Sequence, residues 1–256
     1  MNPSRWTAVF LTALTLGLAL AAGAGAELVQ KGDIRVKFEG QLIPRSLPRS
    51  GEVPVHVAVS ADITALKKAN PPKLKRISIA INSAGRFSPS VVPVCTIRDI
   101  QPSTTQNALK ACGDSLVGTG EFGAKVLFPQ QAAFPSVGKL YAFNGRYQGH
   151  PAILAHVYGT EPVPTSFTLP FVISKRKGEL GTVLTAALSE ATGKAGYITL
   201  LSLDLGRTVG RRSYLSASCP TPKGIGSASF PFAKANFDFG SSTLESTLVR
   251  TCKASG

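Results

Sequence analysis

The chain of 256 residues has few of the side chains that enzymes use for acid–base and metal chemistry. It contains three histidines, His56, His150 and His156, and its 14 acidic residues form no cluster. On one extended strand, His150 and His156 would lie about 20 Å apart, too far to share a metal ion. No G-x-S-x-G nucleophile motif and no C-x-x-C pair occurs. The sequence therefore predicts no catalytic residue, no metal site and no cofactor.

Aromatic side chains that could form a binding platform are also scarce. The single tryptophan is Trp6, near the N-terminus, and phenylalanines outnumber tyrosines 13 to 5. Alternate phenylalanines in the stretch 230–239 are typical of core positions on a strand rather than of a sugar-binding platform. Few aromatics lie among the basic residues, which disfavours a nucleic-acid interface.

Long apolar runs are absent after the first 26 residues. Arg5 precedes the apolar stretch Trp6–Leu20, and Ala24-Gly25-Ala26 is a small-residue cleavage site. This pattern predicts a signal peptide over 1–26, cleaved near Ala26, and a mature chain that is secreted or held at the cell surface. An uncleaved anchor is the alternative. No later run predicts a transmembrane segment in the mature chain.

Residues 27–256 predict a single domain of the all-β class. Asp33–Glu39 and Val53–Ser60 alternate apolar and polar residues, as half-buried strands do. The stretch 139–173 predicts three consecutive strands, with Asn144-Gly145 opening the first tight turn. We expect an antiparallel β-sandwich of about eleven strands, with one short helix near 103–112. Ser103 or Thr104 can cap that helix.

The glycine-rich stretch Gly118–Gly123 formally matches the dinucleotide-binding fingerprint. That motif requires a helix directly after the glycines, whereas Ala124–Phe128 has the composition of a strand. We therefore interpret the glycines as part of a twisted or bulged strand.

The four cysteines predict two disulfides, because free thiols are disfavoured in an exported chain. Sequence alone permits three pairings. Proximity favours Cys95–Cys112 and Cys219–Cys252, which would contribute about 3 and about 4 kcal/mol through chain entropy.

Positive charge is in excess: 28 lysines and arginines face 14 acids, which gives a net charge of +14. Such a bias favours contact with anionic partners, although many exported proteins are simply basic. If consecutive strands reverse direction, the loops 144–150, 174–181 and 206–212 lie at one end of the sandwich, and Cys219 and Cys252 meet at the other. The three loops carry the candidate anion-binding residues Arg146, Lys175, Arg176, Lys177, Arg207, Arg211 and Arg212.

Four strings resemble a group of exported proteins of high-GC actinobacteria that have no assigned function. The strings are Ser115-Leu-Val-Gly-Thr-Gly120, Leu140-Tyr-Ala-Phe-Asn-Gly145, Ile153-Leu-Ala-His-Val-Tyr158 and Tyr214-Leu-Ser-Ala-Ser-Cys219-Pro. The resemblance covers roughly residue 77 to the C-terminus. It implies export and transfers no binding or catalytic role to any residue.

The sequence thus predicts an exported, non-enzymatic cell-envelope or extracellular protein whose basic loop tips contact an anionic polymer or lipid head groups. One alternative is that the loop cations are ordinary solvated charges that prevent strand edges from aggregating. Another is a secreted hydrolase, with a Ser/His/Asp or paired-carboxylate site assembled from distant segments.

Overall fold

The structure, a computed structural model, describes residues 26–68, 70–127, 130–160, 164–188 and 196–255. The predicted signal peptide lies outside these ranges, apart from Ala26. Within them the chain consists mostly of strands, as the alternating sequence predicts.

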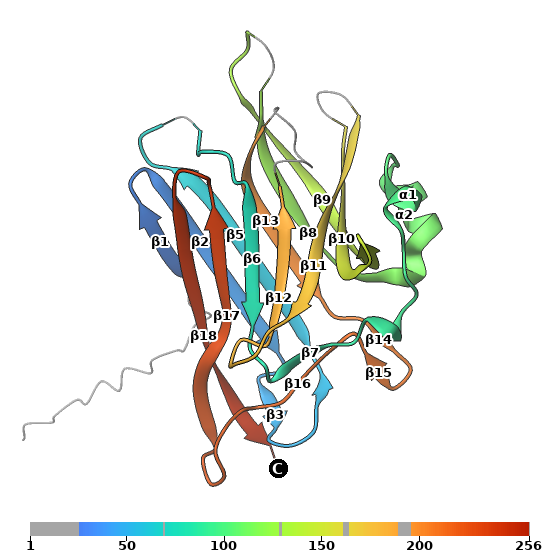
Figure 1. Ribbon diagram of the computed structural model, residues 1–256, viewed down its shortest axis with the longest axis vertical. Coiled ribbons are helices and arrows are strands. Elements are labelled where there is room, and N and C mark those ends of the chain that lie inside the picture. Colours follow the sequence, from blue (N-terminus) through green and yellow to red (C-terminus); the bar gives the residue numbers. More distant parts are fainter. Residues whose placement is uncertain (1–25, 69, 128–129, 161–163, 189–195, 256) are drawn as a thin grey trace, which may run out of the picture.

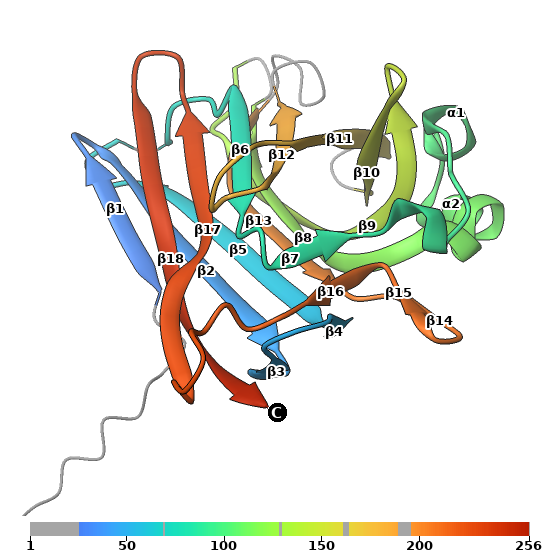
Figure 2. The ribbon, with the colours of Figure 1, turned by 60° about the horizontal axis from the view of Figure 1, so that its bottom comes forward.

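One large sheet of thirteen strands runs through the molecule and curls back on itself (Figures 1 and 2). Its strands, in spatial order, are β1 (Glu27–Lys31), β2 (Ile34–Ile43), β5 (His56–Ala65), β13 (Gly196–Leu205), β8 (Leu116–Val126), β9 (Phe134–Tyr147), β10 (His150–Gly159), β11 (Thr165–Lys175), β12 (Thr182–Ala187), β6 (Arg76–Ile81), β17 (Ser227–Asp238), β18 (Thr243–Ser255) and β3 (Ser46–Pro48).

The main core lies inside the curl, between the two halves of this sheet. Phe38 on β2 packs edge-to-face against Phe237 on β17, with ring centroids 5.9 Å apart. Phe122 on β8 packs in the same way against Phe167 on β11, at 5.0 Å. Burying a side chain of this size contributes about 1.5–3 kcal/mol, so these contacts hold the halves together. The predicted core role of the phenylalanines on β17 is confirmed.

The predicted antiparallel sandwich of eleven strands differs from this architecture. The two facing layers belong to one continuous sheet, and β18 pairs with β3 in parallel, so the sheet is mixed. The Arg250 guanidinium on β18 also donates a hydrogen bond to the Gly40 carbonyl on β2, at 2.6 Å. This bond joins strands that lie near opposite edges of the curled sheet.

Two small sheets accompany the large one. They are β4 (Val53–Pro54), β16 (Leu215–Ala217) and β7 (Gly85–Phe87) in one, and β14 (Thr208–Val209) and β15 (Arg212–Ser213) in the other.

Two short α-helices lie outside β9 and β10 (Figure 2). The α2 helix (Thr105–Cys112) begins after Thr104, whose hydroxyl accepts a hydrogen bond from the Asn107 N–H at 3.2 Å. This is the helix and cap that the sequence predicts. The α1 helix (Ile97–Ile100) was not predicted, because its four residues are too few to show a helical period. Two 3₁₀ turns, η1 (Pro89–Val91) and η2 (Gly113–Ser115), flank this region.

The disulfide Cys95–Cys112 ties these helices together, and Cys219–Cys252 is formed as well, as the sequence predicts. Beneath the helices, the first disulfide packs with Ile100, Phe143 and Leu154 in a second apolar cluster, separate from the main core. We call α1, α2 and this disulfide the helical clamp.

A turn lies within the predicted range 144–150, but the prediction that Asn144-Gly145 forms it is wrong. Both residues lie inside β9 and are buried, and the turn instead occupies Gln148 and Gly149. The Asn144 amide donates to the carbonyls of Pro89, Val92 and Pro93, at 2.9–3.3 Å. A Cβ at Gly145 would lie 2.8 Å from the Cys95 carbonyl oxygen. Both residues therefore serve the packing of the 89–95 segment against β9.

Candidate functional site

The three basic loops predicted from the sequence leave the same end of the large sheet. Since β9, β11 and β13 run in the same direction, their C-terminal ends lie together. Arg146 closes the β9–β10 turn by donating to the Gly149 carbonyl at 3.2 Å. The Lys175 ammonium donates to the Thr182 hydroxyl at 3.0 Å. Arg176, Lys177, Arg211 and Arg212 are exposed.

Arg207 differs from the other basic residues of these loops because it is half-buried. Its backbone carbonyl accepts a hydrogen bond from the Tyr214 N–H at 2.7 Å. The Tyr214 ring packs edge-to-face against Phe87, and burial raises the pKa of its hydroxyl far above the usual range. Arg207 thus belongs to the base of the β14–β15 hairpin, and Tyr214 anchors that hairpin to the core.

The disulfide Cys219–Cys252 lies at this same end, which corrects the prediction that it lies at the opposite one. The β16 strand has three residues and, among the described strands, pairs only with β4 and β7, so the chain does not cross the molecule before reaching Cys219. The Ser218 N–H donates to the Ala84 carbonyl at 3.0 Å, and the Ser83 N–H donates to the Glu179 carbonyl at 2.7 Å. The β11–β12 loop and the disulfide are therefore near neighbours.

Because the disulfide lies at this end, the segments beside it bring further positive charges to the same end of the molecule. The Lys253 N–H bonds to the Arg45 carbonyl at 2.9 Å, and the Arg49 guanidinium bonds to the Ile225 carbonyl at 2.6 Å. We call this surface the cationic end; it comprises Arg45, Arg49, Arg86, Arg146, Lys175, Arg176, Lys177, Arg207, Arg211, Arg212, Lys223 and Lys253.

Acidic side chains at the cationic end are fewer. In the described ranges they are Glu52, Asp114, Glu179 and Asp204, which lies one residue before the end of β13, and Glu52 pairs with Arg86 at 3.0 Å. The opposite end of the sheet also carries lysines, but Asp33 and Asp238 lie among them. Sequence reasoning missed Arg45, Arg49, Arg86, Lys223 and Lys253. The length of the segment 213–218 could have revealed them, because six residues are too few to cross a sheet of ten-residue strands.

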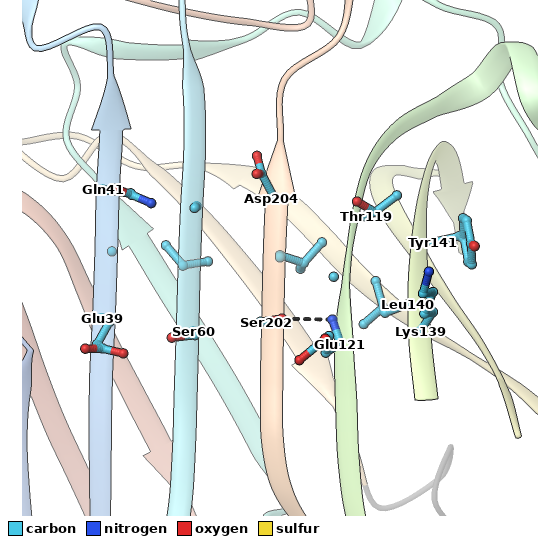
Figure 3. Close-up of a pocket in the computed structure, with 15 residues that line it drawn as sticks. Glu39, Gln41, Ser60, Thr119, Glu121, Lys139, Leu140, Tyr141, Ser202 and Asp204 are labelled. Carbon is cyan, nitrogen blue, oxygen red and sulfur yellow. Dashed lines mark hydrogen bonds between the residues drawn. The ribbon is translucent and has the colours of Figure 1, made fainter. Parts of the chain in front are cut away.

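A second candidate site is a groove on the outer face of the sheet, across β2, β5, β13, β8 and β9 (Figure 3). It is open to solvent and has a volume of about 570 Å³. Polar side chains from alternate positions of the five strands project from this face. They are Glu39, Gln41, Ser60, Thr119, Glu121, Lys139, Tyr141, Ser202 and Asp204. Sequence reasoning did not find this groove, because no motif marks it.

The groove is more acidic than the rest of the protein. Its carboxylates are Glu39, Glu121 and Asp204, and its one ammonium is Lys139, which lies opposite Glu121 in the β8–β9 ladder. Glu39 accepts a salt bridge from Lys37 at 2.9 Å, and this hydrogen bond raises the pKa of Lys37.

Glycines on β8 permit the close approach of β8 to β13 along the groove. A Cβ at Gly118 would lie 2.1 Å from the Asp204 carbonyl oxygen, and a Cβ at Gly120 would lie 1.9 Å from the Ser202 carbonyl oxygen. The ladder also shifts register between Leu116 and Gly118. The interpretation of this stretch as a bulged strand is therefore confirmed, and the glycines help to set the shape of the groove floor.

The histidines lie in three separate environments. His56 is exposed, with Nδ1 3.9 Å from the Asp204 carboxylate, and His150 is exposed in the β9–β10 turn. His156 is fully buried near the backbone of Ile100, and neither of its ring nitrogens has a hydrogen-bond partner in the described chain. Desolvation lowers the pKa of His156. Among the described residues, no serine hydroxyl is hydrogen-bonded to a histidine.

One group of sulfur and acidic side chains lies within metal-ligand distance in the part of the chain that the structure describes. It consists of Cys95, Asp99 and Cys112. Both sulfurs are bonded to each other and have no thiolate to offer, so this group does not fit a metal ion.

No protein-family model, curated protein or solved structure matches the chain. Across the residues that the structure describes, none of the helices has the length and apolar character needed to cross a membrane.

Proposed function

We propose that the chain is an exported, non-enzymatic protein that contacts an anionic polymer of the cell envelope through the cationic end. The observation that carries this proposal is the convergence of the basic loops, the Cys219–Cys252 region and Arg86 on one end of the sheet. Cations gathered on one surface attract a polyanion more strongly than the same charges dispersed, because their potentials add.

The aromatic content of the cationic end argues against nucleic acid as the partner. Tyr214 is buried, and Tyr147 is half-buried against the helical clamp. Neither ring is free to stack on an unpaired base, which is the contact that single-stranded nucleic acids require. Phosphate or carboxylate groups of a polymer need only the cations.

Lipid head groups are the second candidate partner, and one observation favours them. Val209 on the β14–β15 hairpin and Ile225 beside Lys223 are large apolar side chains with 41% and 47% exposure. Apolar residues beside arginine and lysine can enter the interface of an anionic membrane.

The direct test is chromatography on a poly-glutamate column eluted with salt. The variant Arg176→Gln/Lys177→Gln/Arg211→Gln should elute at clearly lower salt than the wild type, because fewer ionic contacts with the column then have to be screened by salt. The matched control, Lys31→Gln/Lys67→Gln/Lys68→Gln, removes equal charge from the opposite end and should elute later than the first variant. Equal elution of the two variants would remove the proposal.

Sedimentation with vesicles separates the two partners. If lipid is the partner, the wild type should sediment with vesicles of phosphatidylglycerol and phosphatidylcholine. The variant Val209→Ser/Ile225→Ser should then remain in the supernatant. Retention on poly-glutamate without retention on these vesicles supports the polymer.

A further inference from the structure

The groove on the outer face of the sheet has the dimensions of a ligand site, and strand residues line it rather than the loops of the cationic end. Its volume of about 570 Å³ falls within the roughly 300–1,000 Å³ typical of small-molecule sites. The side chains that line it come from strands held in register by the ladder. A ligand would therefore meet a surface with little freedom to rearrange.

Two rows of outward side chains cross the groove from β2 to β9. In both rows the floor, on β5 and β13, carries mostly short side chains, and the longer ones lie on β2 and β9. One row is Gln41, Ala58, Asp204, Thr119 and Tyr141; the other is Glu39, Ser60, Ser202, Glu121 and Lys139. The result is a trough with a shallow polar floor and taller sides.

The charges in the groove exclude the ligand class proposed for the cationic end. Lys37 pairs with Glu39, and Lys139 lies opposite Glu121, so the Asp204 carboxylate leaves the groove with a net negative charge that would repel a polyanion. The remaining lining groups include hydrogen-bond donors, acceptors and hydroxyls that are both. Such a mixture matches sugar hydroxyls, since each of them also donates and accepts.

One wall of the groove offers an aromatic ring. Tyr141 on β9 is half-buried and packs against the helical clamp, so the clamp limits the movement of the ring. Its phenol has an apolar body and a polar tip, which suits the C–H face of a pyranose and a neighbouring hydroxyl. From the mixed polar lining, the shallow floor and this supported ring, we infer that the groove binds a neutral oligosaccharide.

The experiment is isothermal titration of the full mature chain with a panel of neutral hexasaccharides: cello-, malto-, manno-, xylo- and chitohexaose. At least one should bind. Ser60→Leu should weaken binding about tenfold or more, because the larger side chain fills the floor without changing any charge. The matched control is Thr64→Leu, on the same strand and the same face but outside the groove, and it should bind within about twofold of the wild type.

Tyr141→Ala is a second, independent variant, and it should also weaken binding about tenfold by removing the aromatic wall. Circular dichroism and thermal unfolding establish that each variant is folded. The variant Arg176→Gln/Lys177→Gln/Arg211→Gln should bind the hexasaccharide like the wild type, which keeps this proposal separate from the one for the cationic end.

Three outcomes would overturn the inference. The first is that none of the five sugars binds, and the second is that folded Ser60→Leu and Tyr141→Ala bind like the wild type. The third is that spermidine or oligolysine displaces the sugars and binds more tightly than they do, which would make the groove a site for cations. Release of shorter sugars from the hexasaccharide would contradict a purely binding role.

Discussion

The cationic end and the groove differ in the secondary structure that carries their residues. The groove consists of strand residues, most of which are paired by ladder hydrogen bonds on both sides; on β2 the pairing with β1 ends at Phe38, before Glu39. The cationic end consists of turns, strand ends and short segments, held by single hydrogen bonds and by the Cys219–Cys252 disulfide. A change that forces β8 and β13 apart therefore perturbs the fold, whereas a change at a loop tip alters charge alone. This difference allows stability and binding to be separated by experiment.

The largest effect should come from opening the disulfide of the cationic end. Replacing both cysteines by serine, Cys219→Ser/Cys252→Ser, should lower the free energy of unfolding by about 4 kcal/mol, because the closed loop restricts the unfolded chain. Cys95→Ser/Cys112→Ser, with its shorter loop, should cost about 3 kcal/mol. Urea denaturation measures both.

The two disulfides should also differ in which site they support. Opening Cys95–Cys112 loosens the helical clamp beside Tyr141 and should weaken hexasaccharide binding, with poly-glutamate retention unchanged. If opening Cys219–Cys252 affected the groove more than opening Cys95–Cys112 did, the assignment of each disulfide to its own region would be wrong.

A somewhat smaller loss should follow from a methyl group in the groove floor. Gly120→Ala should destabilise the fold by about 3 kcal/mol, because the new Cβ meets the Ser202 carbonyl of the adjacent strand, which cannot move aside. Gly159→Ala is the matched control: it is also within a strand, but a Cβ there meets nothing within 4 Å. The control should change the free energy by less than about 1 kcal/mol. Equal denaturation midpoints would show that β8 has room to shift.

The buried His156, which lies beneath the clamp, makes the stability of the fold depend on pH. Burial lowers the folded-state pKa of His156, so below about pH 6.5 the unfolded chain binds a proton that the folded chain does not. Stability is therefore complete above about pH 6.5 and falls as the pH drops, by at most about 1.4 kcal/mol per unit for one proton. His156→Phe should flatten this part of the profile. A profile that stays equally steep in this variant would assign the effect to other groups.

The smallest effect on stability should come from the loop tips. Arg176→Gln/Lys177→Gln/Arg211→Gln should change the free energy of unfolding by no more than about 0.5 kcal/mol, because these side chains are exposed. The same variant should show the largest change in poly-glutamate elution. A large loss of stability here would mean that the tips take part in the fold rather than supplying charge alone.

The alternation of apolar and polar residues was sufficient to predict the β class, several strands and the core role of Phe230–Phe239. It could not predict the closure of the sheet, because closure depends on contacts between β2 and β18, which are remote in sequence. The Asn144-Gly145 error has a local cause. Both residues favour turns, but here a buried amide and a close backbone approach use the same two residue types inside a strand.

The two candidate sites differ in how far the sequence could reveal them. Basic residues at loops are visible as a pattern, and strand direction was enough to group Arg146, Lys175 and Arg211. The predicted placement of Cys219 is wrong because the segment 213–218 contains a strand of only three residues, β16, which does not cross the sheet. The groove depends on the lateral alignment of five strands, and residues such as Ser60 and Thr119 become neighbours only once that alignment is known. The spacing of residues within one strand gives no information about this alignment.

Outward polar residues alternate with inward apolar residues along β13. Ser202 and Asp204 face the groove, while Leu201, Leu203 and Leu205 face the core. The outward set can be exchanged to suit a different sugar while the inward set stays untouched, so new specificities are accessible through substitution alone. Insertion of a single residue into β13 has the opposite outcome: it would turn leucines toward water and the Asp204 carboxylate toward the interior in one step.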